Sequence, residues 1–212
     1  MAHTIFFDLD NTLYPADSGL WDVLGVRIEA FLVEVMGMKV EKITEFRCYC
    51  RDHFSTTLQG LKSLYNIDED EYLRYVHDVE LSNYIQKDKR LNHMLAALPQ
   101  RKIIFTNADE NHAKNVLAHL GITDFFEMII DIRKLWPFVK PQEEAFIKKA
   151  LQLTQLATSD GCIFIDDYKV NVQGASEMGF HAILVGEHTP EEFPNLIADI
   201  YELPEYLSNM RL

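Results

Sequence analysis

Hydrophobic residues in this chain gather in short runs that end at polar residues, a pattern typical of buried strands in a parallel sheet. Five such runs cover residues 4–7, 102–105, 128–132, 162–165 and 182–185. Helical patterns separate the last four runs, at residues 109–120, 141–156 and 169–178. Pro141 opens one of these helical patterns, and Gly121 and Gly179 follow the other two, as helix starts and stops prefer. The alternation predicts an α/β fold whose parallel sheet is covered by helices on both faces.

The interval between the first two runs follows a different pattern. It contains no convincing strand, and its apolar residues recur at helical spacing between Leu20 and Val35. Further helices are predicted at residues 41–57, 68–79 and 88–98. We therefore expect two domains: an α/β core formed by residues 1–18 and 100–212, and a helical cap formed by residues 19–99.

Composition narrows the range of partners. The 212 residues include 20 Lys and Arg and 33 Asp and Glu, which gives a net charge of −13. Such a surface repels nucleic acid and anionic membranes, so we expect neither as a partner. The N-terminal sequence lacks the features of a signal peptide, and three cysteines give no disulfide framework. We expect a cytoplasmic protein, as a monomer or a homodimer, that binds a small phosphorylated substrate.

Polar residues follow each of the first four apolar runs. In an open α/β sheet, ligands bind outside the carboxyl ends of the strands, so these residues are expected to meet at one edge. They are Asp8 and Asp10 after the first run, Thr106 and Asn107 after the second, Lys140 after the third run and a loop, and Asp166 and Asp167 after the fourth.

This set of side chains suits phosphoryl transfer. Several carboxylates at one edge repel one another, and a hard divalent cation such as Mg²⁺ relieves the repulsion. One carboxylate can then attack phosphorus, while a second carboxylic acid protonates the leaving oxygen and later deprotonates water. A hydroxyl, backbone amides and a lysine would hold the phosphate oxygens and balance their charge.

The segments DLDNT, TN, KP and DD followed by Asn171 match, in order, the four signature segments of the haloacid dehalogenase-like phosphatase superfamily. The sequence resembles that superfamily over essentially its whole length. Within it, FFDLDNTLYP, FTNADENHAKNVLAHLGI and FIDDYKVN are most similar to the pyrimidine 5′-nucleotidase group. This resemblance implies a Rossmann-like core with a parallel five-stranded sheet and an all-helical cap inserted after strand one.

The resemblance also implies roles for individual residues. Asp8 would be the nucleophile and a Mg²⁺ ligand, and Asp10 would be the general acid and base, with its backbone carbonyl on the metal. Lys140 would neutralise charge at the nucleophile. Asp167 would be the third metal ligand, because it lies four residues before Asn171.

The remaining implied roles concern the phosphate and the surroundings of the metal. Leu9, Thr106 and the backbone of Asn107 would bind phosphate. Asp166 and Asn171 would lie around the metal ligands without binding the metal themselves. Asp166 and Asp167 are exchangeable in this assignment.

The activity implied is a Mg²⁺-dependent phosphomonoester hydrolase that forms an aspartyl-phosphate, namely a 5′-nucleotidase for pyrimidine nucleoside monophosphates. The alternatives are a phosphatase or phosphomutase for a sugar phosphate or phosphoglycolate, and a non-catalytic phosphate-binding protein of the same fold. The superfamily's carbon–halogen hydrolases lack the second aspartate, and Asp10 argues against that activity.

Other chemistry-bearing residues receive a structural interpretation. The segment CYCRDH does not have zinc-motif spacing and is interpreted as helix packing. The resemblance would place His112 near the site, but we interpret it as a surface or capping histidine. The aromatic residues of the cap are each interpreted as core, and Tyr14 and Trp21 are the best candidates for the alternative, a platform that stacks on a nucleobase.

Overall fold

The computed structural model describes residues 4–189, 191 and 193–210. The chain divides into two compact units, of which the first comprises Met1–Ser18 and Ile85–Leu212 and the second Gly19–Tyr84. Each unit has its own fold, and the two are described in turn.

The described part of the first unit forms a six-stranded sheet in the order β3-β2-β1-β4-β5-β6, and each neighbouring pair is parallel. The strands are β1 (Thr4–Phe7), β2 (Arg101–Phe105), β3 (Met128–Ile130), β4 (Cys162–Asp166), β5 (His181–Val185) and β6 (Leu196–Ile197). The predicted α/β class is confirmed, but the predicted number of five strands is wrong. The sixth strand has only two residues, which is too short to give an alternating or continuous apolar pattern.

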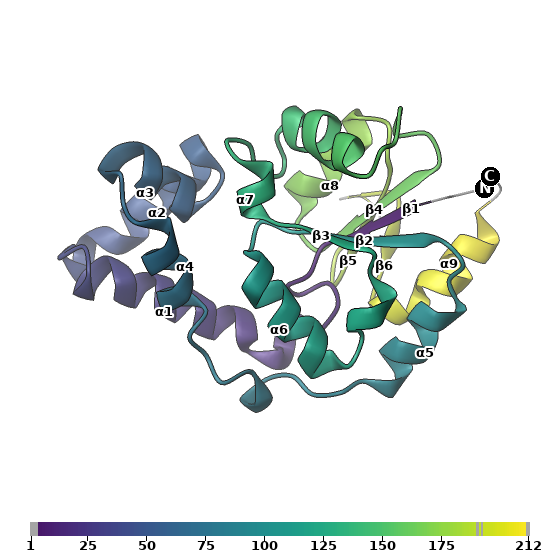
Figure 1. The fold of residues 1–212 in the computed structure, drawn as a ribbon, viewed down its shortest axis with the longest axis horizontal. Helices are drawn as coiled ribbons and strands as arrows, with labels where there is room; N and C mark the ends of the chain where they lie inside the picture. Colours follow the sequence, from purple (N-terminus) through teal and green to yellow (C-terminus); the bar gives the residue numbers. More distant parts are fainter. Residues whose placement is uncertain (1–3, 190, 192, 211–212) are drawn as a thin grey trace. The chain divides into compact units, whose positions relative to one another are not determined.

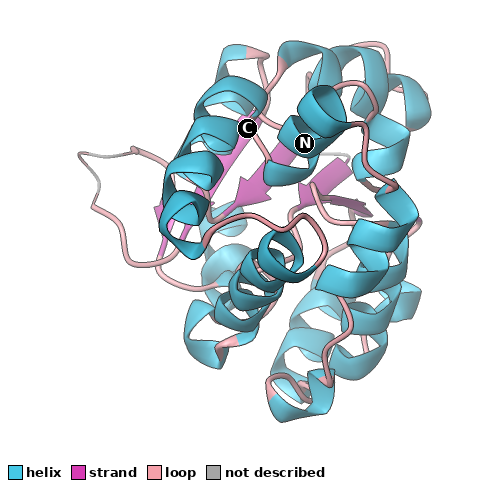
Figure 2. Ribbon diagram, turned by 90° about the vertical axis from the view of Figure 1, so that its left-hand side faces the viewer, coloured by secondary structure: helices cyan, strands magenta, loops and turns pink. Residues whose placement is uncertain are grey.

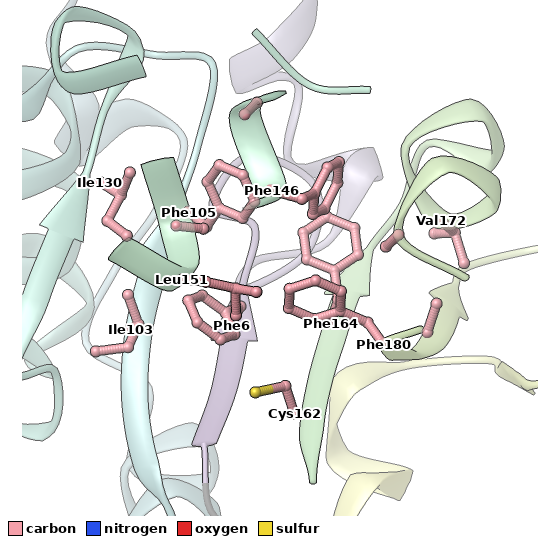
Figure 3. Packing of buried hydrophobic residues seen from close by; sticks show 14 of the residues in the cluster. Phe6, Ile103, Phe105, Ile130, Phe146, Leu151, Cys162, Phe164, Val172 and Phe180 are labelled. Atoms are coloured by element: carbon pink, nitrogen blue, oxygen red, sulfur yellow. The ribbon is translucent and has the colours of Figure 1, made fainter. Parts of the chain in front are cut away.

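One face of the sheet carries an aromatic core. Phe6 on β1 is in register with Ile103 on β2 and Phe164 on β4, so these side chains share a face. Phe146 packs edge-on against Phe105 and Phe164, with ring centroids 5.1 and 5.2 Å apart. Figure 3 shows these rings gathered over the strands. The opposite face is equally buried, because Ile5, Phe7 and Ile104 lie one position along from this set. Burial on both faces explains why the strands read as continuous apolar runs.

Helices cover both faces of this sheet (Figure 2). In Figure 1, α8 and the helix that contains Ala145–Leu151 lie above the strands, and α5, α6 and α9 lie below them. The bounds are α5 (Lys89–Ala97), α6 (Glu110–Leu120), α7 (Ile132–Leu135), α8 (Lys169–Glu177) and α9 (Leu203–Asn209), and single 3-10 turns lie at Ala16–Ser18, Thr123–Phe125 and Ile200–Glu202. Among the described residues, no helix combines the length and the apolar character needed to cross a membrane.

The helix predicted at residues 141–156 differs from the others, because its central part, Ala145–Leu151, is π-helical. Its start is also later than Pro141, since residues 140 and 141 form a turn and the helix begins at Glu143. The helices at 109–120 and 169–178 are confirmed to within one residue at each end, where Asp109 caps α6 and Gly121 closes it with a positive φ of 72°.

The second unit is helical throughout its regular structure. It contains α1 (Leu20–Glu34), α2 (Val40–Phe54), α3 (Thr57–Tyr65), α4 (Glu69–Val76) and a 3-10 turn at Leu81–Asn83. Phe31 packs edge-on against Tyr72 at a centroid distance of 5.0 Å. Cys50 is fully buried where α2 meets α3, and a Cβ atom on Gly60 would lie 2.4 Å from its sulfur. Cys50 therefore serves close helix packing.

The second unit ends before the limit that we set from sequence for the cap. Helix α5, which the pattern placed in the cap at residues 88–98, belongs to the first unit. The amide of Asp88 donates to the Leu120 carbonyl, and Asn92 donates to the Gly121 carbonyl. These bonds attach α5 to the end of α6, a connection that periodicity alone does not reveal.

Gly174 on α8 gives a test of the packing that supports the loop before the π-helical segment. A Cβ atom at this position would lie 2.8 Å from the carbonyl oxygen of Pro141. We expect Gly174→Ala to lower the free energy of unfolding by about 1–3 kcal/mol, as overpacking usually does. Gly25→Ala is the matched control, because its Cβ would meet only the flexible Arg47 side chain at 3.9 Å. Urea denaturation measures both, and equal stability of the two variants would contradict the expectation.

Candidate active site

The acidic cluster forms where β1 and β4 lie side by side. Asp8 follows β1, and its amide donates to the Ile165 carbonyl of β4 at 2.8 Å. Asp166 ends β4, and Asp167 comes next. One carboxylate oxygen each from Asp8, Asp166 and Asp167 lies within 4.8 Å of the others. The direction of strand order reverses between β1 and β4, and such a switch point is the ordinary ligand-binding position in open α/β sheets.

Lys140 lies between two of these carboxylates. Its Nζ donates to Asp8 Oδ1 and to Asp166 Oδ2, both at 2.6 Å. The side chain is only 1% exposed, and the two carboxylates raise the pKa of Lys140 to about 12, although burial opposes this. Lys140 therefore remains a cation in the buried site. The Asn107 side chain holds its backbone, accepting from Lys140 N at 3.0 Å and donating to Lys140 O at 3.1 Å.

Asp166 has most of its acceptor capacity engaged. Besides Lys140, Tyr168 N donates to Oδ1 at 2.8 Å, and Asn171 Nδ2 lies 3.1 and 3.0 Å from Oδ1 and Oδ2. The residue is fully buried. Four contacts with donors orient this carboxylate and leave it little capacity for a further strong ligand.

Burial and neighbouring carboxylates raise the pKa values of Asp8 and Asp167. Burial is the main cause that raises the pKa of Asp8 well above its ordinary value, and Asp166 and Asp167 add repulsion while Lys140 opposes it. Burial and the neighbouring Asp166 raise the pKa of Asp167 to about 7. Both carboxylates thus resist carrying a negative charge beside each other. A hard divalent cation suits such a set, because oxygen donors and excess negative charge are what it requires.

Asp10, two residues after Asp8, has separate partners. The Tyr14 hydroxyl donates to Asp10 Oδ1 at 2.7 Å, and His112 Nε2 lies 2.8 Å from the same oxygen. Burial raises the pKa of Tyr14, and Asp10 raises it further. For His112, burial lowers the pKa, but the charge and the hydrogen bond of Asp10, together with the charge of Asp109, outweigh it and the pKa is raised.

One interpretation made from the sequence is wrong in this region. His112 is not a surface or capping residue, since its side chain is 2% exposed and contacts Asp10. Tyr14 is 3% exposed, which agrees with its interpretation as a core residue and argues against the alternative of stacking on a nucleobase. A clue to His112 was present: it follows the N-cap Asp109 by three positions, in the first turn of the helix after β2. The first turn of such a helix lies at the edge where ligands bind.

The phosphate-binding candidates occupy two adjacent loops. Thr106 is 2% exposed and follows β2, and its Oγ1 accepts from Ala108 N at 3.0 Å. Leu9 is fully buried, and its carbonyl accepts from Leu13 N in the loop after β1. Thr12 Oγ1 lies 3.4 Å from Asp8 Oδ2. β1 and β2 are neighbours, so both loops leave the same edge of the sheet.

A doubly wound parallel sheet with an acidic cluster and a buried lysine at its switch point defines a class of ligand-binding α/β proteins. The family model for haloacid dehalogenase-like hydrolases matches residues 2–179, and the chain belongs to that family.

Similar proteins include the Phosphate metabolism protein 8 of Saccharomyces cerevisiae. It is 26% identical over 224 residues, which cover 97% of this chain and 68% of the yeast protein. Among solved structures, the L-2-haloacid dehalogenase of Xanthobacter autotrophicus has a TM-score of 0.65 at 16% identity, covering 99% of this chain and 100% of that one. A β-phosphoglucomutase of Clostridium difficile has a TM-score of 0.63 at 19% identity, covering 98% and 96%. These two structures show that the fold is shared.

The raised pKa of Asp167 predicts how stability depends on pH when no metal is bound. The folded state keeps a proton up to about pH 7 that an unfolded aspartate releases near pH 4. Asp167 should therefore lower the free energy of unfolding as pH rises through this interval, by about 1.4 kcal/mol per pH unit, and the raised pKa of Asp8 adds a change of the same sign. Urea denaturation in EDTA at pH 5, 6 and 7 measures this dependence, and Asp167→Asn should make the slope shallower.

The control for this experiment is Asp124→Asn, which replaces an exposed aspartate and should keep the slope of the parent protein. An unchanged slope in Asp167→Asn would contradict the assignment. Adding a divalent cation at pH 7 should raise the stability of the parent protein more than that of Asp167→Asn.

Proposed function

We propose that this protein is a Mg²⁺-dependent phosphomonoester hydrolase that acts through an aspartyl-phosphate on Asp8, with pyrimidine nucleoside 5′-monophosphates as its substrates. The observation that carries the proposal is the buried cluster in which Lys140 joins Asp8 and Asp166 while Asp167 lies beside them. The family membership and the order of the four sequence motifs support the same chemistry.

In the first step, an oxygen of Asp8 attacks phosphorus, and the bond to the leaving oxygen breaks. The leaving alkoxide takes a proton from Asp10. Lys140 stays charged throughout and balances the negative charge that the phosphate brings to Asp8. Asn107 contributes by holding the Lys140 backbone, in addition to the amide predicted to bind phosphate.

In the second step, Asp10 accepts a proton from a water molecule that attacks the phosphorus on Asp8, and free phosphate and the Asp8 carboxylate result. Thr106 and the backbone amides of Leu9 and Asn107 would hold the phosphate oxygens in both steps. Proton transfer at Asp10 favours ester hydrolysis over dehalogenation, because a departing halide needs no proton.

Asp8, Asp167 and the backbone carbonyl of Asp10 would hold the Mg²⁺, which supplies charge neutralisation and orients the phosphate when bound. Asp167 fits this role better than Asp166, because the carboxylate of Asp166 already accepts from Lys140, Asn171 and the Tyr168 amide. The chemistry of the donor set, carboxylate and carbonyl oxygens, matches a hard cation.

A substrate panel tests the proposed activity. Phosphate release is measured from UMP, CMP, AMP, dUMP, phosphoglycolate and p-nitrophenyl phosphate, each with Mg²⁺ and with EDTA. We expect turnover that requires Mg²⁺ and is fastest on UMP and CMP. Fastest turnover on phosphoglycolate would keep the chemistry and replace the substrate. Absence of turnover on every ester, from protein shown to be folded, would favour a non-catalytic phosphate-binding role.

The nucleophile is tested by Asp8→Asn. Loss of an attacking group typically costs several orders of magnitude, so we expect kcat to fall by at least about 10³-fold. Asp124→Asn, an exposed aspartate, is the matched control and should keep full activity. Circular dichroism and thermal unfolding check that the variant folds. Substantial phosphatase activity in folded Asp8→Asn, prepared alongside the parent, would remove Asp8 as the nucleophile.

A further inference from the structure

Two buried donors converge on a single oxygen of Asp10. The Tyr14 hydroxyl and His112 Nε2 both lie within 2.8 Å of Oδ1. Tyr14 belongs to the same loop as Asp10, four residues later, whereas His112 comes from α6, 102 residues along the chain. The three side chains are thus brought together by the fold of the first unit.

The position of His112 is set by its own helix end. Asp109 caps α6, and His112 N donates to Asp109 Oδ1 at 3.0 Å. Asp109 is itself 3% exposed. This cap fixes the first turn of α6, and with it the direction in which the imidazole leaves the helix.

Burying these three polar side chains costs free energy of desolvation. The side chains of His112 and Asp10 are 2% and 8% exposed, and Tyr14 is 3% exposed. The hydrogen bonds between the groups offset most of the free energy that is lost when polar groups leave water. An apolar side chain of similar size would fill the same space without this loss. The gain from the polar pair is orientation, because two donors on one oxygen restrict rotation of the carboxyl group.

We propose that His112 and Tyr14 are positioning residues for Asp10, which hold Oδ1 so that the proton exchanged with the substrate is carried on Oδ2. The inference rests on the proposed function, in which Asp10 is the general acid and base. In the first step the P–O bond breaks, its electron pair goes to the leaving oxygen, and the proton on Oδ2 moves to that oxygen. In the second step Oδ2 takes a proton from the attacking water.

The test uses the leaving group. A nucleoside alkoxide is a poor leaving group that needs the proton from Asp10, whereas p-nitrophenolate is a stable anion that leaves without it. The kcat/KM reports the steps up to departure of the leaving group and excludes the later hydrolysis of Asp8-phosphate. Misplacing Asp10 should therefore lower kcat/KM for the alkyl phosphates of the panel and spare p-nitrophenyl phosphate.

For His112→Ala we expect kcat/KM on alkyl phosphates to fall about 10- to 100-fold, in line with the effect of a misplaced catalytic group. On p-nitrophenyl phosphate we expect a change of less than about threefold. His112→Gln should recover part of the loss, since its amide N–H can reach Asp10. His119→Ala is the matched control on the same helix, because His119 is half-buried near the far end of α6 and its Nδ1 contacts the Asn115 carbonyl of that helix. This variant should leave both substrates unaffected.

Tyr14→Phe provides a second variant that keeps the buried ring and removes only the hydroxyl. It should show the same selectivity for alkyl esters, with a loss of about tenfold. This variant decides the question if His112→Ala fails to fold.

An equal loss on alkyl and aryl esters, or no loss on either, would overturn the positioning role while leaving the proposed function standing. Absence of turnover on every ester in the parent protein would overturn the proposed function, and the positioning role with it. The two failures are therefore distinguished by the activity of the parent.

Discussion

The buried ammonium of Lys140 is the constraint on which the rest of the site depends. It joins Asp8 and Asp166, which arrive from adjacent strands and would otherwise face each other as buried like charges. Removing one partner from a buried ionic group typically costs about 3–5 kcal/mol, so the lysine cannot be lost without reorganisation. Its position depends in turn on Asn107, whose amide group holds the Lys140 backbone from the loop after β2. One cation thereby links three strands of the sheet.

The sheet makes this meeting possible because its order reverses between β1 and β4. Residues that follow these two strands come close although they lie more than 150 positions apart. The aromatic core also contacts the lysine, because Lys140 Nζ lies 5.5 and 5.4 Å from the ring centroids of Phe105 and Phe164. Gly174 lets α8 approach the Pro141 carbonyl closely, and this holds the residue next to Lys140 in place. Packing and electrostatics at the site are therefore parts of the same arrangement.

The sequence predicted what depends on local patterns. The apolar runs located β1, β2, β4 and β5 almost to the residue, and the rule that polar residues follow strands selected Asp8, Lys140 and Asp167. It failed where an element is too short to have a period, as with β6, and where a helix departs from regular geometry, as at Ala145–Leu151. It also failed for His112: its place in the first turn after β2 pointed to the ligand-binding edge, but nothing in the local sequence shows that its imidazole turns inward to lie 2.8 Å from Asp10.

Asp8 and Asp10 are only two residues apart, yet the fold gives them opposite surroundings. Asp8 faces an ammonium and two further carboxylates, whereas Asp10 faces a phenol and an imidazole. An attacking group has to be ionised, and a group that donates a proton has to hold one without losing its orientation. A charged lysine serves the first requirement, and donors directed at one oxygen serve the second. The different tasks that we propose for these two carboxylates thus depend on partners from different elements: the loop before the π-helical segment for Asp8, and the first turn of α6 for Asp10.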